Sequence, residues 1–320
     1  MGQGLHLIYQ NAVIMKTDFK SKTELVRYYA DEEKCKALLA QQRWGNSPAC
    51  PHCGNAAKIY VTNRGYKCGE KTCYKKFTVT TGTIFENTKI KLNLWFEAIF
   101  VITAHKKGIS SHQLAKDIGC TQKTAWFILH RVREMLKEKS PELLSGTVEI
   151  DETYNGAPYE NKHKSKRVKS GQGRSLVAKK PIIGLLQRGG KVWAQPVDKT
   201  DRATLLPIMV ERVAPGSTVC TDEYSSYRPL GKLFEHGVVK HKHGEYVRGD
   251  FHTNGIENYW SLLKRGIVGV YHQVTPKHLH RYCFEFSYRY NSRKTKDVER
   301  FNHVLSHSEG RLTWNSLTAE

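Results

Sequence analysis

The chain has 320 residues, of which 51 are Lys or Arg and 30 are Asp or Glu, giving a formal net charge of +21 at pH 7. This length accommodates two or three domains with cores of their own. No apolar run approaches the roughly 18 residues that a membrane-spanning helix needs, so we expect no such helix. The positive charge favours a polyanionic partner, because binding to phosphates releases counterions. A basic protein with a merely solvated surface is the alternative.

The N-terminal sequence MGQGLHLIYQNAVIMK lacks the basic region and the cleavage site of a secretory signal. Eight cysteines in such a chain indicate metal ligands and buried thiols rather than disulfides. We therefore expect a cytoplasmic, nucleoid-associated protein of a prokaryote, or a nuclear protein, with no membrane partner. Residues 18–46 predict one helix and a turn, and residues 1–46 are assigned as an N-terminal helical segment.

Four cysteines within residues 47–84 have the spacing of a zinc ribbon. Two residues separate Cys50 from Cys53, four separate Cys68 from Cys73, and fourteen lie between the pairs. Two such knuckles joined by a short hairpin place four thiolates tetrahedrally around one Zn²⁺. Because the site is closed, we predict a structural ion that stabilises a segment too small for its own core. Four reduced structural cysteines are the alternative.

Residues 85–140 have helical periodicity and predict a helix-turn-helix domain. A short helix starts at Ser110, where a capping box is possible, and a turn at Gly119 precedes a longer recognition helix. Polar side chains of that helix remain for solvent or a phosphate backbone: Gln122, Lys123, Thr124, His130, Arg131 and Arg133. We select Lys123, Thr124 and Arg131 as DNA-binding residues. A plain helical bundle is the alternative, and the zinc ribbon and the net charge favour DNA binding.

After Pro141 the pattern changes from helical to strand-like. Between residues 147 and 154, Val148 and Ile150 fall on one side of a strand while Glu149 and Asp151 fall on the other. The further expected elements are a hairpin of strands at 181–187 and 191–197, a helix at 205–213 and a strand at 218–221. This order predicts an α/β domain with a mixed sheet, which we place at residues 145–300.

A basic insertion interrupts this domain at residues 161–180. It contains eight Lys or Arg residues and no acid. A solvated loop is one interpretation of such a composition. The other is a segment that becomes ordered on DNA near the active site.

Three acids of this domain are candidates for one metal site. Asp151 and Asp222 end predicted strands, and Glu257 lies on a predicted helix that starts at Gly255. If the sheet brings them together, two Mg²⁺ ions would offset the repulsion among three carboxylates. Such a metal pair activates a water and stabilises the leaving 3′ oxygen of a phosphodiester. Ordinary acids at strand ends are the alternative, and four neighbours compete by residue type: Glu149, Glu152, Glu223 and Asp250.

The sequence HTNGIENYWSLLKR predicts an amphipathic helix around Glu257. Lys264 falls on the same side as this acid, and an apolar stripe beside it holds Ile256, Trp260 and Leu263. We expect Trp260 to fix the direction of Glu257. The histidines of the region fit phosphate contacts or helix caps better than a closed metal site: His252, His272, His278 and His280.

The chain resembles the DDE-type transposases of prokaryotic insertion sequences that carry an N-terminal zinc ribbon and a retroviral-integrase-like core. The resemblance covers about residues 20 to 300. It rests on these ordered blocks: RWGNSPACPHCG, TGTIFENTKIKLNLWFEAI, KKGISSHQLAKDIGCTQKTAWFILHRVRE, VEIDETYNG, TDEYSSY, HTNGIENYWSLLKRGIVGVYHQV and KHLHRYCFEFSYRYNSR. The insertion at 161–180 and the tail at 301–320 depart from the family's pattern.

The resemblance implies a multidomain α/β protein in which a ribonuclease-H-like mixed-sheet catalytic core follows the zinc ribbon and the helix-turn-helix domain. It implies that Asp151, Asp222 and Glu257 are a catalytic triad that binds two Mg²⁺ or Mn²⁺ ions. It further implies that Lys264 contacts transposon-end DNA, and we add its neighbour Arg265.

The implied activity is that of a transposase. Such an enzyme binds the terminal inverted repeats of its insertion sequence, cleaves their 3′ ends and joins them to target DNA. Because two DNA ends must meet, it acts as a homodimer or higher oligomer in the synaptic complex. A nuclease without strand transfer and a non-enzymatic DNA-binding protein are the alternatives, and the intact acids count against the second.

Overall fold

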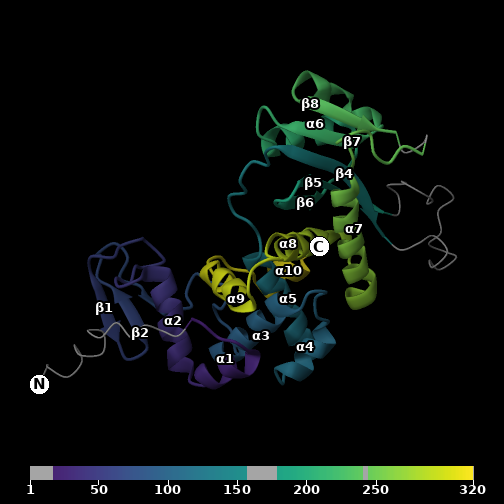
Figure 1. The fold of residues 1–320 in the computed structure, drawn as a ribbon. Helices are drawn as coiled ribbons and strands as arrows, with labels where there is room; N and C mark the ends of the chain where they lie inside the picture. Colours follow the sequence, from purple (N-terminus) through teal and green to yellow (C-terminus); the bar gives the residue numbers. More distant parts are fainter. Residues whose placement is uncertain (1–16, 157–178, 241–243, 320) are drawn as a thin grey trace, which may run out of the picture. The chain divides into compact units, whose positions relative to one another are not determined.

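The computed structural model describes residues 17–156, 179–240 and 244–319. The chain forms two compact units (Figure 1). The first comprises Met1–Ala104, Leu114–Met135 and Lys296–Glu320, and the second comprises His105–Gln113 and Leu136–Thr295. Most of the predicted basic insertion, residues 161–178, lies outside the described residues. Within the described ranges, no helix has the length and hydropathy needed to cross a membrane.

The first unit begins with two helices where the sequence predicted one. Helix α1 (Lys22–Tyr28) ends before a second start at Asp31, whose side chain accepts a hydrogen bond from the amide of Glu33 and caps α2 (Glu32–Trp44). The prediction of one helix was wrong because this cap divides the segment. Helix α2 ends at Gly45, which has a positive φ of 57°.

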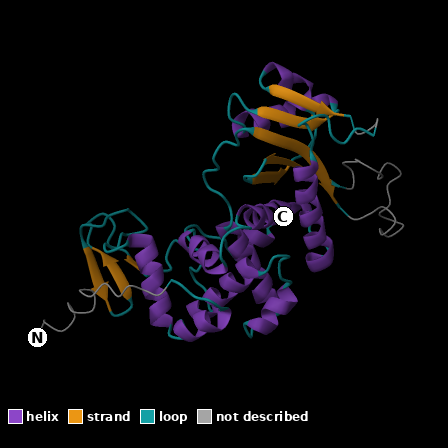
Figure 2. Ribbon diagram, viewed as in Figure 1, coloured by secondary structure: helices purple, strands orange, loops and turns teal. Residues whose placement is uncertain are grey.

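A three-stranded antiparallel sheet follows, drawn in orange in Figure 2 together with the larger sheet of the second unit. Its strands are β1 (Ile59–Thr62), β2 (Gly65–Cys68) and β3 (Lys76–Phe77). Trp44, at the end of α2, packs edge-on against the rings of Tyr66 and Phe77, at centroid distances of 5.3 and 5.9 Å. These three rings belong to the small core of the sheet, which also includes Cys50 and Cys68.

The rest of the first unit is helical. Helix α3 (Leu92–Ala104) packs against α9 (Asp297–Ser306), where the rings of Phe96 and Phe301 meet edge to face at 5.5 Å. Helices α4 (Ser111–Asp117) and α5 (Gln122–Met135) flank a turn at Gly119, as predicted. The last helix is α10 (Trp314–Thr318). The expected separate tail at 301–320 therefore folds with the N-terminal unit.

The second unit is built on a five-stranded sheet in the order β6-β5-β4-β7-β8. Strands β4, β7 and β8 run parallel, and β5 and β6 are antiparallel to their neighbours. The strands are β4 (Thr147–Asn155), β5 (Lys180–Gln187), β6 (Val192–Pro196), β7 (Thr218–Asp222) and β8 (Glu235–Val239). The prediction of a mixed sheet is confirmed, and β8 is a strand that the sequence did not predict.

Helices cover both faces of this sheet. Helix α6 (Arg202–Arg212) and the 3₁₀ segment Ser225–Lys232 pack on one face, where Ile183 and Leu185 of β5 point. Helices α7 (Asn254–Gly266) and α8 (Leu279–Asn291) share the other core with Ile182 and Leu186. The π-helical turn Ile267–Tyr271 and the short segment Pro276–His278 connect α7 to α8.

Candidate active site and cysteine cluster

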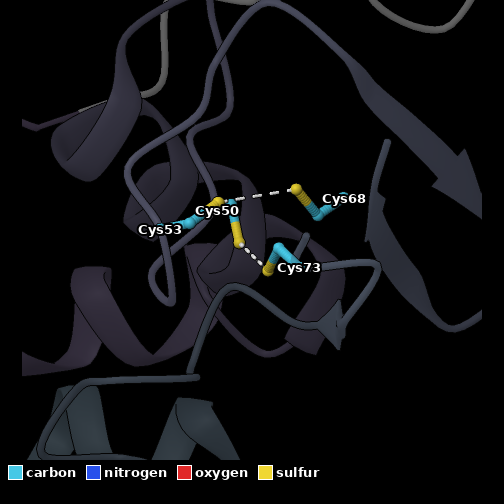
Figure 3. A group of neighbouring side chains, drawn as sticks. All are labelled: Cys50, Cys53, Cys68 and Cys73. Atoms are coloured by element: carbon cyan, nitrogen blue, oxygen red, sulfur yellow. Dashed lines mark hydrogen bonds between the residues drawn. The ribbon is translucent and has the colours of Figure 1, made fainter. Parts of the chain in front are cut away.

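The four predicted zinc ligands lie together in the first unit (Figure 3). The Sγ atoms of Cys50 and Cys73 are 3.8 Å apart, and those of Cys53 and Cys68 are 3.6 Å apart. A tetrahedral site with Zn–S bonds of about 2.3 Å places its sulfurs about 3.8 Å apart. The amide of Glu70 also donates to the sulfur of Cys68 over 3.4 Å, which stabilises a thiolate. The cluster thus has the dimensions of a structural zinc site.

The other four cysteines lie outside this cluster. Cys35, Cys220 and Cys283 are buried, and Cys120 is half-buried. Burial raises the pKa of the Cys220 thiol, and burial likewise raises the pKa of the Cys35 thiol to about 12. These groups therefore remain protonated thiols, in agreement with their predicted role as small apolar residues.

Two of the predicted DNA-binding residues of α5 are accessible. Lys123 is exposed, and its Nζ lies 4.7 Å from the centre of the Trp314 ring. Thr124 is half-buried, and its hydroxyl lies 2.9 Å from that of Thr121, which also accepts a hydrogen bond from the Thr124 amide. Thr121 thereby caps the start of α5.

The expectation that His130, Arg131 and Arg133 face solvent is wrong, because all three side chains are buried. Arg131 is 6% exposed, and its Nε donates a hydrogen bond to the carbonyl oxygen of Leu312 over 3.0 Å. The C-terminal segment causes this burial: the Trp314 ring packs edge-on against Phe127 at 5.4 Å. Arg131 is therefore a packing residue in this structure and does not present its guanidinium to DNA.

The three candidate acids lie on adjacent elements of the second unit. Asp151 is in β4, Asp222 is the last residue of β7, and Glu257 is in the first turn of α7. Because β4 and β7 are parallel and Glu149 pairs with Cys220, the two aspartates lie at equal distances along neighbouring strands. Parallel pairing thus brings both strand acids to one edge of the sheet.

Each acid is oriented by a hydrogen bond. Asp151 accepts one from the indole Nε1 of Trp260 over 3.1 Å. Asp222 accepts one from the amide of Tyr224 over 2.9 Å. The hydroxyl of Thr253 donates to Oε1 of Glu257 over 2.9 Å. Asp151 is therefore held by a residue of α7, Asp222 by the turn that follows β7, and Glu257 by the N-cap of its own helix.

The pKa of Asp151 is raised from 3.8 to about 6, mainly by burial and in addition by the nearby negative charges of Asp222 and Glu257. The Trp260 indole and the Glu152 amide partly oppose this increase. The three acids thus interact, but their oxygens are not closely clustered. Among the described residues, only the four cysteines form a group of three or more ligand-type side chains with ligand atoms within 4.8 Å of one another.

One competing acid has a different role. Glu149 is completely buried, pairs with Arg188 over 2.8 Å and accepts a hydrogen bond from the amide of Ile256 over 3.0 Å. It is bound within the protein and points away from solvent. The sequence carried no signal for this arrangement, because Arg188 lies far from Glu149 along the chain.

The remaining residues of α7 lie as the helical pattern predicted. Ile256, Trp260 and Leu263 are buried in the core shared with α8. Lys264 and Arg265 are exposed, and Nε of Arg265 donates to the carbonyl oxygen of Ser261 over 3.2 Å. The helix therefore presents an acid near its start and two cations near its end, next to a buried apolar side.

Comparisons with known proteins identify the family to which a chain with this fold and these features belongs. Residues 143–291 match the model of the ISXO2-like transposase domain, and residues 30–76 match that of a transposase zinc-ribbon domain. An uncharacterized protein in transposable element ISH50 of Halobacterium salinarum is 31% identical over 253 residues, covering 75% of this chain and 84% of that protein. The chain belongs to the ISXO2-like (IS1595) transposase family.

Two further similarities are weaker or shorter. An uncharacterized transposase-like protein of Haemophilus influenzae is 33% identical over 107 residues, covering 33% of this chain and 85% of that protein. A chain of the simian T-cell lymphotropic virus intasome, solved with PP2A regulatory subunit B56 gamma, has 14% identity and a TM-score of 0.27. That match covers 54% of this chain and 63% of the intasome chain, less than two thirds of its length. Because this score is low, the ribonuclease-H-like assignment rests on the family match and on the observed strand order.

The predicted resemblance to zinc-ribbon DDE transposases is therefore confirmed, as is the fold class.

Proposed function

We propose that this protein is a DDE transposase that cleaves the 3′ ends of its insertion sequence and joins them to target DNA. In this proposal Asp151, Asp222 and Glu257 are the catalytic carboxylates. The main support is the arrangement of three elements: the parallel pairing of β4 with β7 brings Asp151 and Asp222 to one edge of the sheet, and Trp260 of the helix that carries Glu257 donates a hydrogen bond to Asp151. The family match supplies the class of reaction.

The donor set fits two Mg²⁺ or Mn²⁺ ions, because carboxylate oxygens are the ligands that these hard cations prefer and the charges of Asp222 and Glu257, which act on Asp151, favour cation binding. When bound, such ions activate the attacking oxygen and stabilise the leaving 3′ oxygen of the phosphodiester. The protein's own contribution is orientation: Trp260, the Tyr224 amide and Thr253 each fix one carboxylate. No covalent intermediate with the protein is required.

DNA binding follows from the charge of the chain and from its exposed cations. We assign Lys264 and Arg265 of α7 to the DNA end at the active site, and Lys123 and Thr124 of α5 to the terminal repeat. The cysteine cluster would hold one structural Zn²⁺, which its sulfur–sulfur distances of 3.6 and 3.8 Å fit. Two DNA ends must be joined in one reaction, so we propose at least a homodimer in the synaptic complex, at the nucleoid of a prokaryotic cell.

A strand-transfer assay tests this function. A duplex carrying the end of the protein's own element, labelled at one strand, is incubated with supercoiled plasmid and Mg²⁺. We expect both a shortened labelled strand and label joined to the plasmid. Cleavage without joined product would instead indicate a nuclease, and binding without cleavage would indicate a DNA-binding protein that has lost catalysis.

A further inference from the structure

An ion pair with a buried carboxylate lies next to the candidate acids in the chain: the side chains of Glu149 and Arg188 are 1% and 26% exposed. The Glu149 side chain is completely buried, and its Oε1 accepts a hydrogen bond from Nε of Arg188 over 2.8 Å. A carboxylate in such a position is costly unless it is paired and hydrogen-bonded. Its second oxygen, Oε2, accepts a hydrogen bond from the amide of Ile256 over 3.0 Å. Both oxygens of Glu149 are thus bound within the protein.

The Arg188 guanidinium holds the segment that enters α7. Its Nη1 donates to the carbonyl oxygen of Asp250 over 2.6 Å, and its Nη2 donates to that of His252 over 3.0 Å. The Arg188 amide also donates to the carbonyl oxygen of Thr147 over 2.9 Å, which fixes this residue beside β4. The planar guanidinium fork can make several such bonds at once, whereas a lysine ammonium lacks this geometry.

The pair meets all three elements that carry the candidate acids. Glu149 lies two residues before Asp151 in β4. Its partner in the β4–β7 ladder is Cys220, which lies two residues before Asp222 and whose Sγ is 3.8 Å from Nη2 of Arg188. Ile256, whose amide Glu149 binds, is the residue before Glu257.

The start of α7 depends on this carboxylate. Thr253 occupies the N-cap position and makes no side-chain capping bond, and its hydroxyl donates to Glu257. A free helix amide needs another acceptor, and a negative charge at a helix N-terminus is favourable. Glu149 supplies both. Gly255 permits the approach, since a Cβ there would lie 2.8 Å from Oε2 of Glu149 and 3.1 Å from Leu186.

We infer that Glu149 and Arg188 form a positioning pair, which sets the three candidate acids relative to one another by joining β4, β7 and the start of α7. This role rests on the proposed function, because in that reaction the three acids must keep fixed relative positions to bind divalent metal ions. Neither residue touches the reacting atoms in this proposal. The pair acts only through the elements it joins.

Two substitutions separate positioning from general stability. Arg188→Lys keeps the positive charge and loses the fork, and Glu149→Gln keeps the shape and loses the negative charge. The matched control is Arg289→Lys, which alters another ion pair of the same unit. There Nη2 of Arg289 lies 2.6 Å from Glu285, and the two side chains are 9% and 1% exposed. That pair binds Tyr271 and the carbonyl oxygen of His105 rather than the acid-bearing strands.

The experiment combines amide hydrogen exchange with Mn²⁺ titration by calorimetry on the zinc-loaded full-length protein. We expect Arg188→Lys and Glu149→Gln to accelerate exchange in the peptide spanning residues 253–259 and to weaken Mn²⁺ binding about 10- to 100-fold. Arg289→Lys should lower the melting temperature but leave the exchange rate at 253–259 and the Mn²⁺ affinity near their wild-type values.

Wild-type exchange at 253–259 in both variants, or equal weakening of Mn²⁺ binding by the control, would overturn the positioning role. So would unchanged Mn²⁺ affinity alongside accelerated exchange. If the wild-type protein binds no Mn²⁺ at these acids while exchange still accelerates selectively, the proposed metal-dependent function fails and the structural role of the pair stands.

Discussion

The indole Nε1 of Trp260 donates a 3.1 Å hydrogen bond to Oδ2 of Asp151. The same ring packs over β5 at Gly184, where an added Cβ would lie 2.5 Å from the indole, so only glycine accommodates it. Gly184 is also the register partner of Asp151 in the β4–β5 ladder. One residue of α7 therefore anchors the helix in the core and orients the first strand acid.

This relationship predicts different effects for two substitutions of Trp260. Trp260→Phe keeps an aromatic ring and loses the hydrogen bond, so metal-dependent cleavage should fall about tenfold with a small loss of stability. Trp260→Ala should also destabilise the fold by about 3–5 kcal/mol. Cleavage rates and thermal melting curves of both variants measure these two effects. Trp193→Phe, a change of the same kind in β6, is the control. Full activity of Trp260→Ala would show that the helix does not orient the acids.

The raised pKa of Asp151 predicts a pH-dependent stability effect. Its folded-state pKa of about 6 exceeds the ordinary 3.8, mainly because of burial. The stabilising contribution of the protonated group is therefore complete below about pH 4 and is lost as the pH rises through 6. Without added Mg²⁺, Asp151→Asn should thus be more stable than wild type by up to about 3 kcal/mol at pH 7.5, and by less at pH 5.

Urea unfolding at the two pH values measures this difference. The exposed Asp198 is the control, because its hydrogen bond with Lys180 lowers its pKa. Asp198→Asn should bring no gain in stability at pH 7.5. If Asp151→Asn were less stable than wild type at pH 7.5, burial of the Asp151 carboxylate would not be destabilising, and the raised pKa would be contradicted.

The zinc ribbon gives a separate prediction. Cys68→Ser removes one ligand of the cluster and should release the metal, because three remaining thiolates bind Zn²⁺ more weakly than a closed site of four. The expected result is about one zinc per wild-type chain and little in the variant, with melting of the first unit at lower temperature. Metal analysis and calorimetry measure these quantities. Cys120 lies outside the cluster, so Cys120→Ser should retain the zinc. Equal zinc loss in Cys120→Ser would argue against the four cysteines as the zinc ligands.

Local sequence patterns predicted the elements with strong periodicity. The apolar stripe of α7, the paired cysteines and the hairpin between β5 and β6 all follow from short-range spacing, and the structure contains each of them. The parallel pairing of β4 with β7 could be proposed only as a condition for bringing Asp151 to Asp222, because no local signal sets it.

Long-range contacts were not predictable. The burial of Arg131 depends on the carbonyl of Leu312, which is 181 residues away, in a segment without a recognisable pattern. The pairing of Glu149 with Arg188 depends on the register of three strands and a helix. In both cases a distant part of the chain binds a charged side chain whose burial the local pattern did not predict.

The contrast between Arg131 and Lys123 tests this correction. Arg131→Ala removes the hydrogen bond to Leu312 and the contact with Phe127, where the guanidinium lies 4.3 Å from the ring centre. It should lower the stability of the first unit by about 1–3 kcal/mol. Lys123→Ala should leave stability unchanged, weaken DNA binding and reduce the salt dependence of log K by about one unit. Melting curves and DNA-binding isotherms at several salt concentrations distinguish these outcomes. If Arg131→Ala were as stable as wild type and reduced the salt dependence of log K, Arg131 would be a phosphate contact after all.

The central claim is that Asp151, Asp222 and Glu257 together perform Mg²⁺-dependent DNA cleavage. The most direct measurement is the cleavage rate on a duplex carrying the element's own end, for Asp151→Asn, Asp222→Asn and Glu257→Gln beside Glu223→Gln and Asp250→Asn. In each of the first three variants the cleavage rate should fall more than about a hundredfold, which exceeds the effect of a residue that only orients a metal ligand. The Glu223→Gln and Asp250→Asn variants should cleave at nearly the wild-type rate. Wild-type cleavage by any of the three would contradict the assignment of that acid to the active site.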